Sequence, residues 1–88
     1  MFAVFVSSTF RKQFKRLPED KKERIRKGLD ELEKDPFNTR PGADIKPLAD
    51  TDPRKHRLRV GDHRVVYRVK EKEVRVIELF RRGRGYRK

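Results

Sequence analysis

The 88-residue chain contains no cysteine and no tryptophan, and hydrophobic residues make up only 33% of it. Without cysteine there is neither a disulfide framework nor a thiolate for catalysis or metal binding. No apolar run approaches the ~20 residues that a membrane-spanning helix needs. The apolar residues 1–6 are too short for a signal peptide, and basic residues follow them instead of preceding them. We therefore expect a cytoplasmic protein in which residues 1–88 form a single domain.

Familiar catalytic and nucleotide-binding motifs are also missing. The sequence has no GxxxxGK[ST] phosphate loop, no GxGxxG before a helix and no HExxH pair. It has two histidines, no cysteine and no local group of carboxylates, so no metal site is expected. Ser7, Ser8 and Thr9 precede a helical pattern and are interpreted as helix caps, not as nucleophiles. The sequence thus predicts neither a metal nor another cofactor.

Positive charge is what the chain has in excess, with a formal net charge of +12. Residues 54–88 hold 14 Lys or Arg against 4 Asp or Glu, whereas acidic residues outnumber basic ones in residues 19–53. A scattered excess often serves solubility alone, but a concentrated one favours a polyanionic partner. We expect that partner to meet the C-terminal third.

Hydrophobic periodicity predicts an α+β domain. Apolar and β-branched residues at alternating or continuous positions indicate strands, and apolar residues at helical spacing indicate helices. The expected strands are residues 2–6, 45–48, 55–60, 64–69 and 73–80, and the expected helices are residues 9–16 and 18–35. Gly61-Asp62 is expected to form a hairpin turn. The order β-α-α-β-β-β-β predicts a helical hairpin packed on one face of a mainly antiparallel, twisted sheet.

Alternation along the later strands predicts two unlike faces of this sheet. His56 and Tyr67 fall on the apolar face, so we interpret His56 as structural and Tyr67 as a core residue. The opposite face is expected to be cationic and to carry Lys55, Arg57, Arg59, Arg64 and Arg68.

Such a set of residues suits phosphodiester chemistry. RNA is cut when its 2′-hydroxyl attacks the adjacent phosphorus, which requires removal of a proton, stabilisation of a dianionic transition state and protonation of the leaving oxygen. Arginine matches phosphate oxygens with a planar fork of donors. Lysine can take the proton when nearby cations favour its neutral form, and Lys55 lies among Arg54, His56 and Arg57. A tyrosine can stack on an unpaired base.

The segment RLRVGDHRVVYRV, followed by RVIELFRRGRGY, resembles the C-terminal half of the RelE branch of the RelE/ParE toxin superfamily. Both show a basic strand, a G-D-x-R-x-x-Y hairpin and an R-G-R-x-Y tail. The N-terminal strand, the helical hairpin and Leu17-Pro18 between the helices match as well, so the resemblance covers nearly the whole chain.

This resemblance implies the toxin of a type II toxin–antitoxin system. Its activity would be that of a metal-independent endoribonuclease that depends on the ribosome and cleaves mRNA in the ribosomal A site by 2′-hydroxyl attack. The implied partners are a cognate RelB-like antitoxin and mRNA on the ribosome, with contacts to ribosomal RNA and none to a membrane.

The resemblance also implies roles for individual residues. Arg64 matches the arginine on the scissile phosphate, Arg82 matches one that stabilises the transition state or leaving group, and Tyr86 matches an aromatic that stacks on the cleaved codon. Lys55 and Arg57 match two basic positions of the preceding strand. Some family members have lysine where this chain has Arg57, and arginine holds its proton too tightly to act as a base. The general base therefore stays open between Lys55, His56 and a substrate-assisted route.

Other basic residues of the C-terminal third are expected to contact RNA or the ribosome. They are Arg54, Arg59, Arg68, Arg81, Arg84, Arg87 and Lys88. His63, next to Arg64, is a further candidate for reaching the substrate.

Two other functions remain open on the sequence. A ParE-like poison of DNA gyrase would share the fold and the basic charge, but such poisons generally lack this combination of arginines and tyrosine. A non-catalytic RNA-binding or ribosome-binding module would need the basic face but no particular residue on it.

Overall fold

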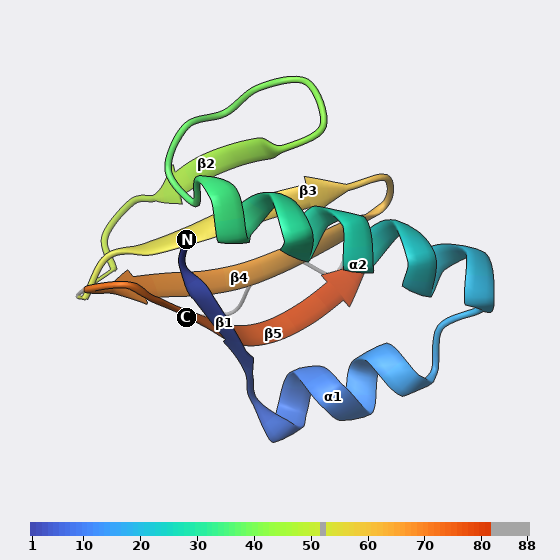
Figure 1. Ribbon diagram of the computed structural model, residues 1–88. Coiled ribbons are helices and arrows are strands. Elements are labelled where there is room, and N and C mark those ends of the chain that lie inside the picture. Colours follow the sequence, from blue (N-terminus) through green and yellow to red (C-terminus); the bar gives the residue numbers. More distant parts are fainter. Residues whose placement is uncertain (52, 82–88) are drawn as a thin grey trace.

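The computed structural model describes residues 1–51 and 53–81, so Arg82, Arg84, Tyr86, Arg87 and Lys88 lie outside the described residues. Its elements follow the expected order (Figure 1). They are β1 (Ala3–Val6), α1 (Ser8–Lys15), α2 (Glu19–Lys34), β2 (Asp44–Leu48), β3 (Lys55–Val60), β4 (His63–Lys70) and β5 (Glu73–Arg81). The predicted α+β class is confirmed, and the predicted boundaries agree to within one residue.

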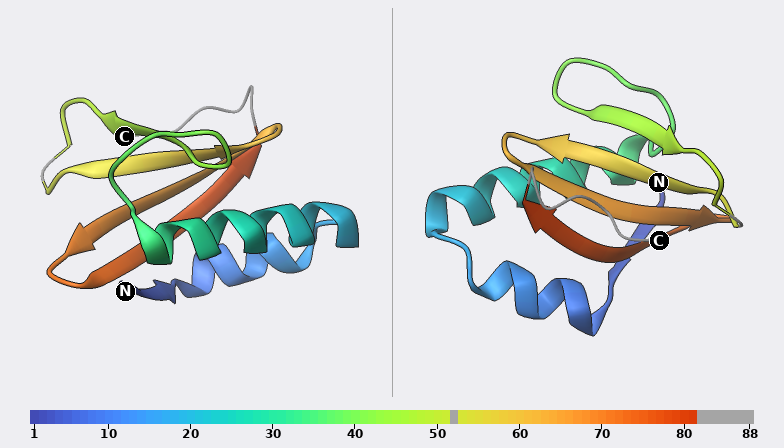
Figure 2. Two further views of the ribbon diagram at one scale, coloured as in Figure 1. Left: turned by 45° about the horizontal axis from the view of Figure 1, so that its top comes forward. Right: turned by 180° about the vertical axis from the view of Figure 1, so that it is seen from behind.

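The five strands form one mixed sheet in the order β1-β5-β4-β3-β2. The three pairings among β2 to β5 are antiparallel, and β1 pairs in parallel with β5. The N-terminal strand β1 thus lies beside the last strand β5. The helical hairpin connects β1 to β2, which lies at the opposite edge of the sheet. Both helices lie on the same side of the sheet, as the views in Figure 2 show. The prediction of a helical hairpin on one face of a mainly antiparallel sheet is confirmed.

The hydrophobic core fills the space between this face and the helices. Ile25 and Leu32 of α2 pack in one cluster with Leu58, Val65 and Tyr67, and each of these side chains is at most 1% exposed. The expectation that Tyr67 is a core residue is therefore confirmed.

A glycine allows α2 to approach β3 closely. A Cβ atom built on Gly28 would lie 2.9 Å from Cδ2 of Leu58 and 3.1 Å from Cγ2 of Val60. Real carbon atoms avoid such distances because of steric repulsion, so the helix can pack at this depth because position 28 has no side chain.

Strand β5 contains a bulge that re-aims its second half. Val66 pairs with Glu78 but Tyr67 pairs with Val76, so Ile77 is an extra residue on β5. Such an insertion disrupts the local ladder and leaves backbone groups that need other partners. Ser7 supplies one, because its hydroxyl donates a hydrogen bond to the Ile77 carbonyl.

Ser7 and a residue of α1 thus supply hydrogen-bond partners for the backbone of β5 where it extends past β1. The Ser7 oxygen also accepts a hydrogen bond of 3.0 Å from the Phe10 amide, which makes Ser7 the N-cap of α1. The Leu79 amide donates to Oε1 of Gln13 at 2.6 Å. Helix α1 is therefore attached to β5 by polar contacts as well as by packing.

The double role of Ser7 makes a testable prediction. Ser7→Ala removes both the cap and the donor to the Ile77 carbonyl, and we expect a loss of about 1–2 kcal/mol in the free energy of unfolding. Urea unfolding followed by circular dichroism measures it. Ser8→Ala, at the exposed first residue of α1, is the control and should change stability by much less. Equal effects of the two substitutions would contradict the double role.

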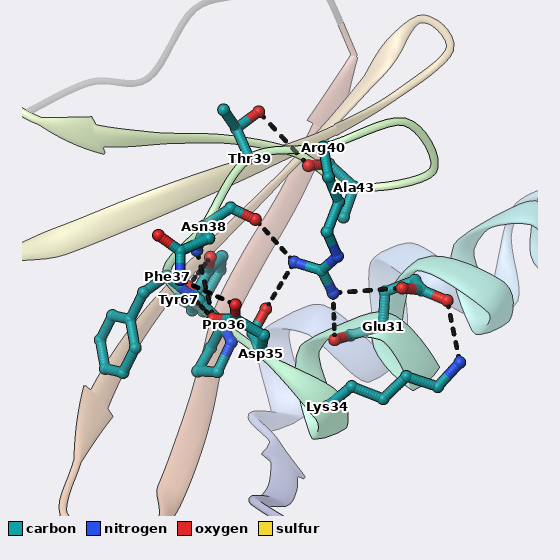
Figure 3. A network of polar contacts seen from close by, with 10 residues as sticks. All are labelled: Glu31, Lys34, Asp35, Pro36, Phe37, Asn38, Thr39, Arg40, Ala43 and Tyr67. Carbon is teal, nitrogen blue, oxygen red and sulfur yellow. Dashed lines mark hydrogen bonds and ion pairs between the residues drawn. The ribbon is translucent and has the colours of Figure 1, made fainter.

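The loop that follows α2 is held by Arg40 (Figure 3). Its guanidinium donates to the carbonyl oxygens of Glu31 (2.9 Å), Asp35 (2.9 Å) and Asn38 (2.6 Å), and it pairs with the Glu31 carboxylate at 3.1 Å. A cation that binds carbonyls at a helix C-terminus also interacts favourably with the helix dipole. Arg40 is thus a structural arginine that fixes where β2 begins.

The same loop is joined to the core by Tyr67. Its buried hydroxyl donates a hydrogen bond of 2.7 Å to the Pro36 carbonyl. Burial raises the pKa of Tyr67, so the hydroxyl keeps the proton that it donates.

Among the residues that the structure describes, no helix combines the length and the apolar character needed to cross a membrane.

Candidate nucleic-acid interface

Basic side chains gather on the sheet face opposite the helices, which we call the cationic face. Strand alternation places them there because their neighbours in sequence, such as Leu58 and Val65, are buried under the helices. The face is defined by Lys55, Arg57, Arg59, Arg64, Arg68 and Arg75. The first five were predicted from the sequence. Arg75 was missed, although alternation from the buried Val74 and Val76 places it here.

One row of this face contains Arg64. In the register, Arg59 of β3 stands opposite Arg64 of β4, and Arg64 stands opposite Phe80 of β5. Arg64 is half-buried, with its Nη1 atom fully buried, and Arg59 is exposed. A half-buried guanidinium is held in place by its neighbours and needs less reordering to bind a phosphate.

The middle row places Arg57 opposite Val66, and Val66 opposite Glu78. Val66 is fully buried, although the alternation puts it on the cationic face. Arg57 and Glu78 thus stand on either side of an apolar position in the centre of the face.

Asp44, which was not predicted from the sequence as a site residue, orients Arg57 and Arg59. Asp44 on β2 pairs with Arg57 at 3.1 Å and with Arg59 at 3.9 Å. The side chain of Arg57 is only 17% exposed, whereas that of Asp44 is 50% exposed. Asp44 lies in a proline-rich segment whose local pattern indicates a loop. Only the pairing of β2 with β3 places Asp44 opposite Arg59.

Two predicted RNA-contacting residues lie apart from these rows. Arg54 is exposed and precedes β3. Arg81 was expected to follow the last strand, but it is the last residue of β5, where it stands opposite His63. It therefore lies on the helix side of the sheet. Its contact with RNA stays a prediction, as do those of Arg84, Arg87 and Lys88, which lie outside the described residues.

His56 lies on the helix side, as the alternation predicted. Its ring stacks on Tyr67, with centroids 5.6 Å apart, and meets Phe37 edge-on at 5.9 Å. Burial and then the charge of Arg54 lower the pKa of His56. A ring in this position faces away from Lys55 and Arg64, which makes His56 a poor candidate for a base on the cationic face.

His63 also faces the helix side. It is 9% exposed and lines a hollow of ≈ 810 Å³ between α1, the start of α2 and the end of β5. Burial, followed by the positive charges of Lys21 and Arg81, lowers the pKa of His63, while Asp62 acts in the opposite direction. These effects favour the neutral form of His63, whose ring lies on the helix side and does not join Arg64 on the cationic face.

These lowered pKa values predict a loss of stability in mild acid. Below pH 6.5, the ordinary pKa of histidine, the unfolded chain binds more protons at His56 and His63 than the folded chain does. The free energy of unfolding therefore falls from pH 6.5 towards pH 5. Glu31 and Asp35, whose pKa values are lowered from 4.5 and 3.8, act only at lower pH. Urea midpoints measured from pH 5 to 8 should fall with acid, and His63→Gln should flatten the change. An unchanged slope in this variant would contradict the assignment to His63.

Comparison with known proteins bears on what this face does. Residues 4–86 match the family described as the ParE toxin of the type II toxin–antitoxin system parDE. A chain of the RelE–RelB complex from Pyrococcus horikoshii OT3 is 30% identical, with a TM-score of 0.81 over 96% of this chain and 98% of that chain. This chain belongs to the RelE/ParE superfamily of type II toxins, in its RelE branch. The resemblance inferred from the hairpin and tail is thereby confirmed.

Two more distant structures share the toxin's fold. A chain of the RelB–RelE complex from Methanococcus jannaschii is 21% identical, with a TM-score of 0.72 over 88% of each chain. A chain of the RelBE complex from E. coli is 22% identical, with a TM-score of 0.63 over 92% of the toxin and 96% of that chain. The comparison with curated proteins gives no match.

Proposed function

We propose that this toxin is an endoribonuclease that cleaves mRNA in the A site of the ribosome. The observation that carries the proposal is the half-buried Arg64, which stands beside Arg59 on the cationic face. Arginines placed before the substrate arrives can stabilise the charge that develops on a phosphate without reorganising.

In the proposed reaction, the 2′-oxygen of the RNA bonds to the adjacent phosphorus and the bond from phosphorus to the 5′-oxygen breaks. The proton of the 2′-hydroxyl passes to a base, and the departing 5′-oxygen gains a proton. Arg64 would bind the phosphoryl oxygens, and Arg57 on the neighbouring strand β3 is a further cation of the same face. Lys55 is the remaining side-chain candidate for the base, because His56 lies on the other side of the sheet. Arg82 and Tyr86 keep their expected roles at the leaving group and the codon.

We propose a RelB-like antitoxin as the partner that restrains this activity. The similar structures from P. horikoshii, M. jannaschii and E. coli are complexes with RelB. An antitoxin segment with acidic and apolar residues suits a strongly basic toxin, because opposite charges steer it and apolar contacts hold it. The hollow beside His63 offers such chemistry, since leucine and proline side chains line it together with Lys12, Arg16 and Lys21.

Inhibition of DNA gyrase is the second candidate, because the matching family is the ParE toxin. Primer extension on a defined message in a cell-free translation reaction separates the two. New cuts that require both ribosomes and the toxin would support the nuclease. An intact message together with gyrase-dependent DNA cleavage would support the gyrase poison. No effect in either assay would overturn both candidates and leave a basic binding domain.

A further inference from the structure

A third row of side chains crosses four strands of the cationic face, from β1 at the edge of the sheet to β3. Phe5 of β1 stands opposite Arg75 of β5, and Arg75 stands opposite Arg68 of β4. Lys55 stands beside Arg68, since the next pair along is His56 with Tyr67. The row therefore consists of three basic side chains on adjacent strands, with the Phe5 ring at its β1 end.

The row surrounds a shallow hollow of ≈ 380 Å³ whose lining includes all four of these side chains and Ile77. Phe5 is 44% exposed, and the Arg75 guanidinium carbon lies 4.7 Å from the centroid of its ring. Arg75 is also paired with Glu73 at 2.6 Å, which fixes the guanidinium beside the ring. Arg68 is exposed.

We infer that Phe5, Arg75 and Arg68 of this row form a subsite for one unpaired nucleotide of single-stranded RNA, with its base on Phe5 and Arg75 and its phosphate at Arg68, while Lys55 at the end of the row stays the candidate base of the proposed reaction. Bases stack on aromatic rings and on guanidinium planes, and a basic groove beside them follows the backbone. The inference rests on the proposed function, because it takes RNA as the substrate.

The subsite is distinct from the proposed cleavage position. Arg64 and Arg68 are four residues apart on β4, a separation of about 13 Å along an extended strand. The row therefore binds a nucleotide that flanks the reacting one and adds to affinity and orientation.

A purely structural role would assign Arg75 to covering Phe5. That role needs only these two side chains, because an arginine stem can cover an apolar neighbour on its own. It gives no reason for Arg68 and Lys55 to continue the row or for a hollow to lie between them. The two roles differ in what RNA binding should depend on.

Binding of a fluorescently labelled oligoribonucleotide tests the subsite. Its 2′-hydroxyls are methylated, so it cannot be cleaved, and anisotropy reports the dissociation constant. We expect Phe5→Leu, which keeps an apolar side chain but removes the ring, to weaken binding about tenfold. The matched control is Phe37→Leu, which changes another exposed phenylalanine (51%) on the helix side and should leave binding unchanged.

Salt dependence tests the phosphate contact. Arg68→Gln should reduce the slope of log affinity against log salt by about 0.7, the value for one phosphate of a single strand. Arg11→Gln removes the same charge from an exposed position of α1 and should leave the slope unchanged. An abasic nucleotide at the stacked position should also remove the tenfold sensitivity to Phe5→Leu, because base and ring act as one pair.

The inference is overturned if the wild-type toxin fails to bind the oligonucleotide at low salt, or if Phe5→Leu and Phe37→Leu bind it equally. The same preparations are tested for mRNA cleavage in the translation reaction, which separates this outcome from failure of the proposed function. Cleavage with no effect of Phe5→Leu on binding removes only the subsite. Tenfold weaker binding by Phe5→Leu with no cleavage by the wild type removes only the nuclease.

Discussion

Arg64→Gln is expected to reduce ribosome-dependent cleavage of mRNA by about 100- to 1,000-fold, the usual loss when one preorganised donor to a developing negative charge is removed. Glutamine keeps most of the length of the side chain but has no charge and no fork of donors. The rate should fall more than the affinity, because the interaction strengthens as charge builds up on the phosphate. Time courses of primer extension at saturating ribosome concentration measure the rate.

Arg59→Gln is the matched control for this prediction. Arg59 stands directly opposite Arg64 and on the same face, so the substitution removes the same charge from almost the same place. We expect a loss of only a few-fold, because Arg59 is exposed and shares Asp44 with Arg57. A non-catalytic binding module would instead lose similar, small amounts at both positions. Equal effects would therefore contradict the role given to Arg64, and thermal unfolding of both variants checks that each is folded.

Leu58→Ala is expected to destabilise the toxin by about 3 kcal/mol, because a fully buried leucine leaves a cavity that its neighbours fill only in part. Leu58 lies under Gly28, at the closest approach between α2 and the sheet. A loss of this size is a large part of the roughly 5–15 kcal/mol that stabilises a small domain. The midpoint of thermal unfolding should therefore fall by more than about 10 °C.

Leu48→Ala provides the comparison for Leu58→Ala. Leu48 ends the edge strand β2 and is half-buried, so its truncation leaves no closed cavity and should cost about 1 kcal/mol or less. Similar midpoints for the two variants would show that the space under Gly28 collapses around the smaller side chain.

Placement of Glu78 and Leu79 shows where prediction from the sequence stopped. Strict alternation from Val74 and Val76 would put Glu78 in the core and Leu79 outside. The bulge at Ile77 reverses this, so that Leu79 is 3% exposed and Glu78 lies beside Val66 on the cationic face. No local pattern marks the bulge, because it depends on the register with β4 and on the hydroxyl of Ser7, 70 residues away.

The candidate site divides in the same way. Lys55, Arg57, Arg59, Arg64 and Arg68 were predicted, because alternation within one strand is a local property of the chain. The hairpin and tail pointed correctly to the RelE/ParE superfamily, which the comparisons confirm. Asp44 and Phe5 were missed, since each joins the cationic face only through strand pairing: β2 with β3 for Asp44, and β1 with the distant β5 for Phe5.

By itself, the sequence determined the type and order of the elements, the two-faced character of the strands and the family, because periodicity, turn residues and motifs act over short distances. Only the tertiary structure decided that β1 lies beside β5, that His63 and Arg81 face the helices, and that Phe5, Arg75, Arg68 and Lys55 form one row. Strand register depends on how the whole core packs and on hydrogen bonds between distant segments, and these are properties of the folded chain.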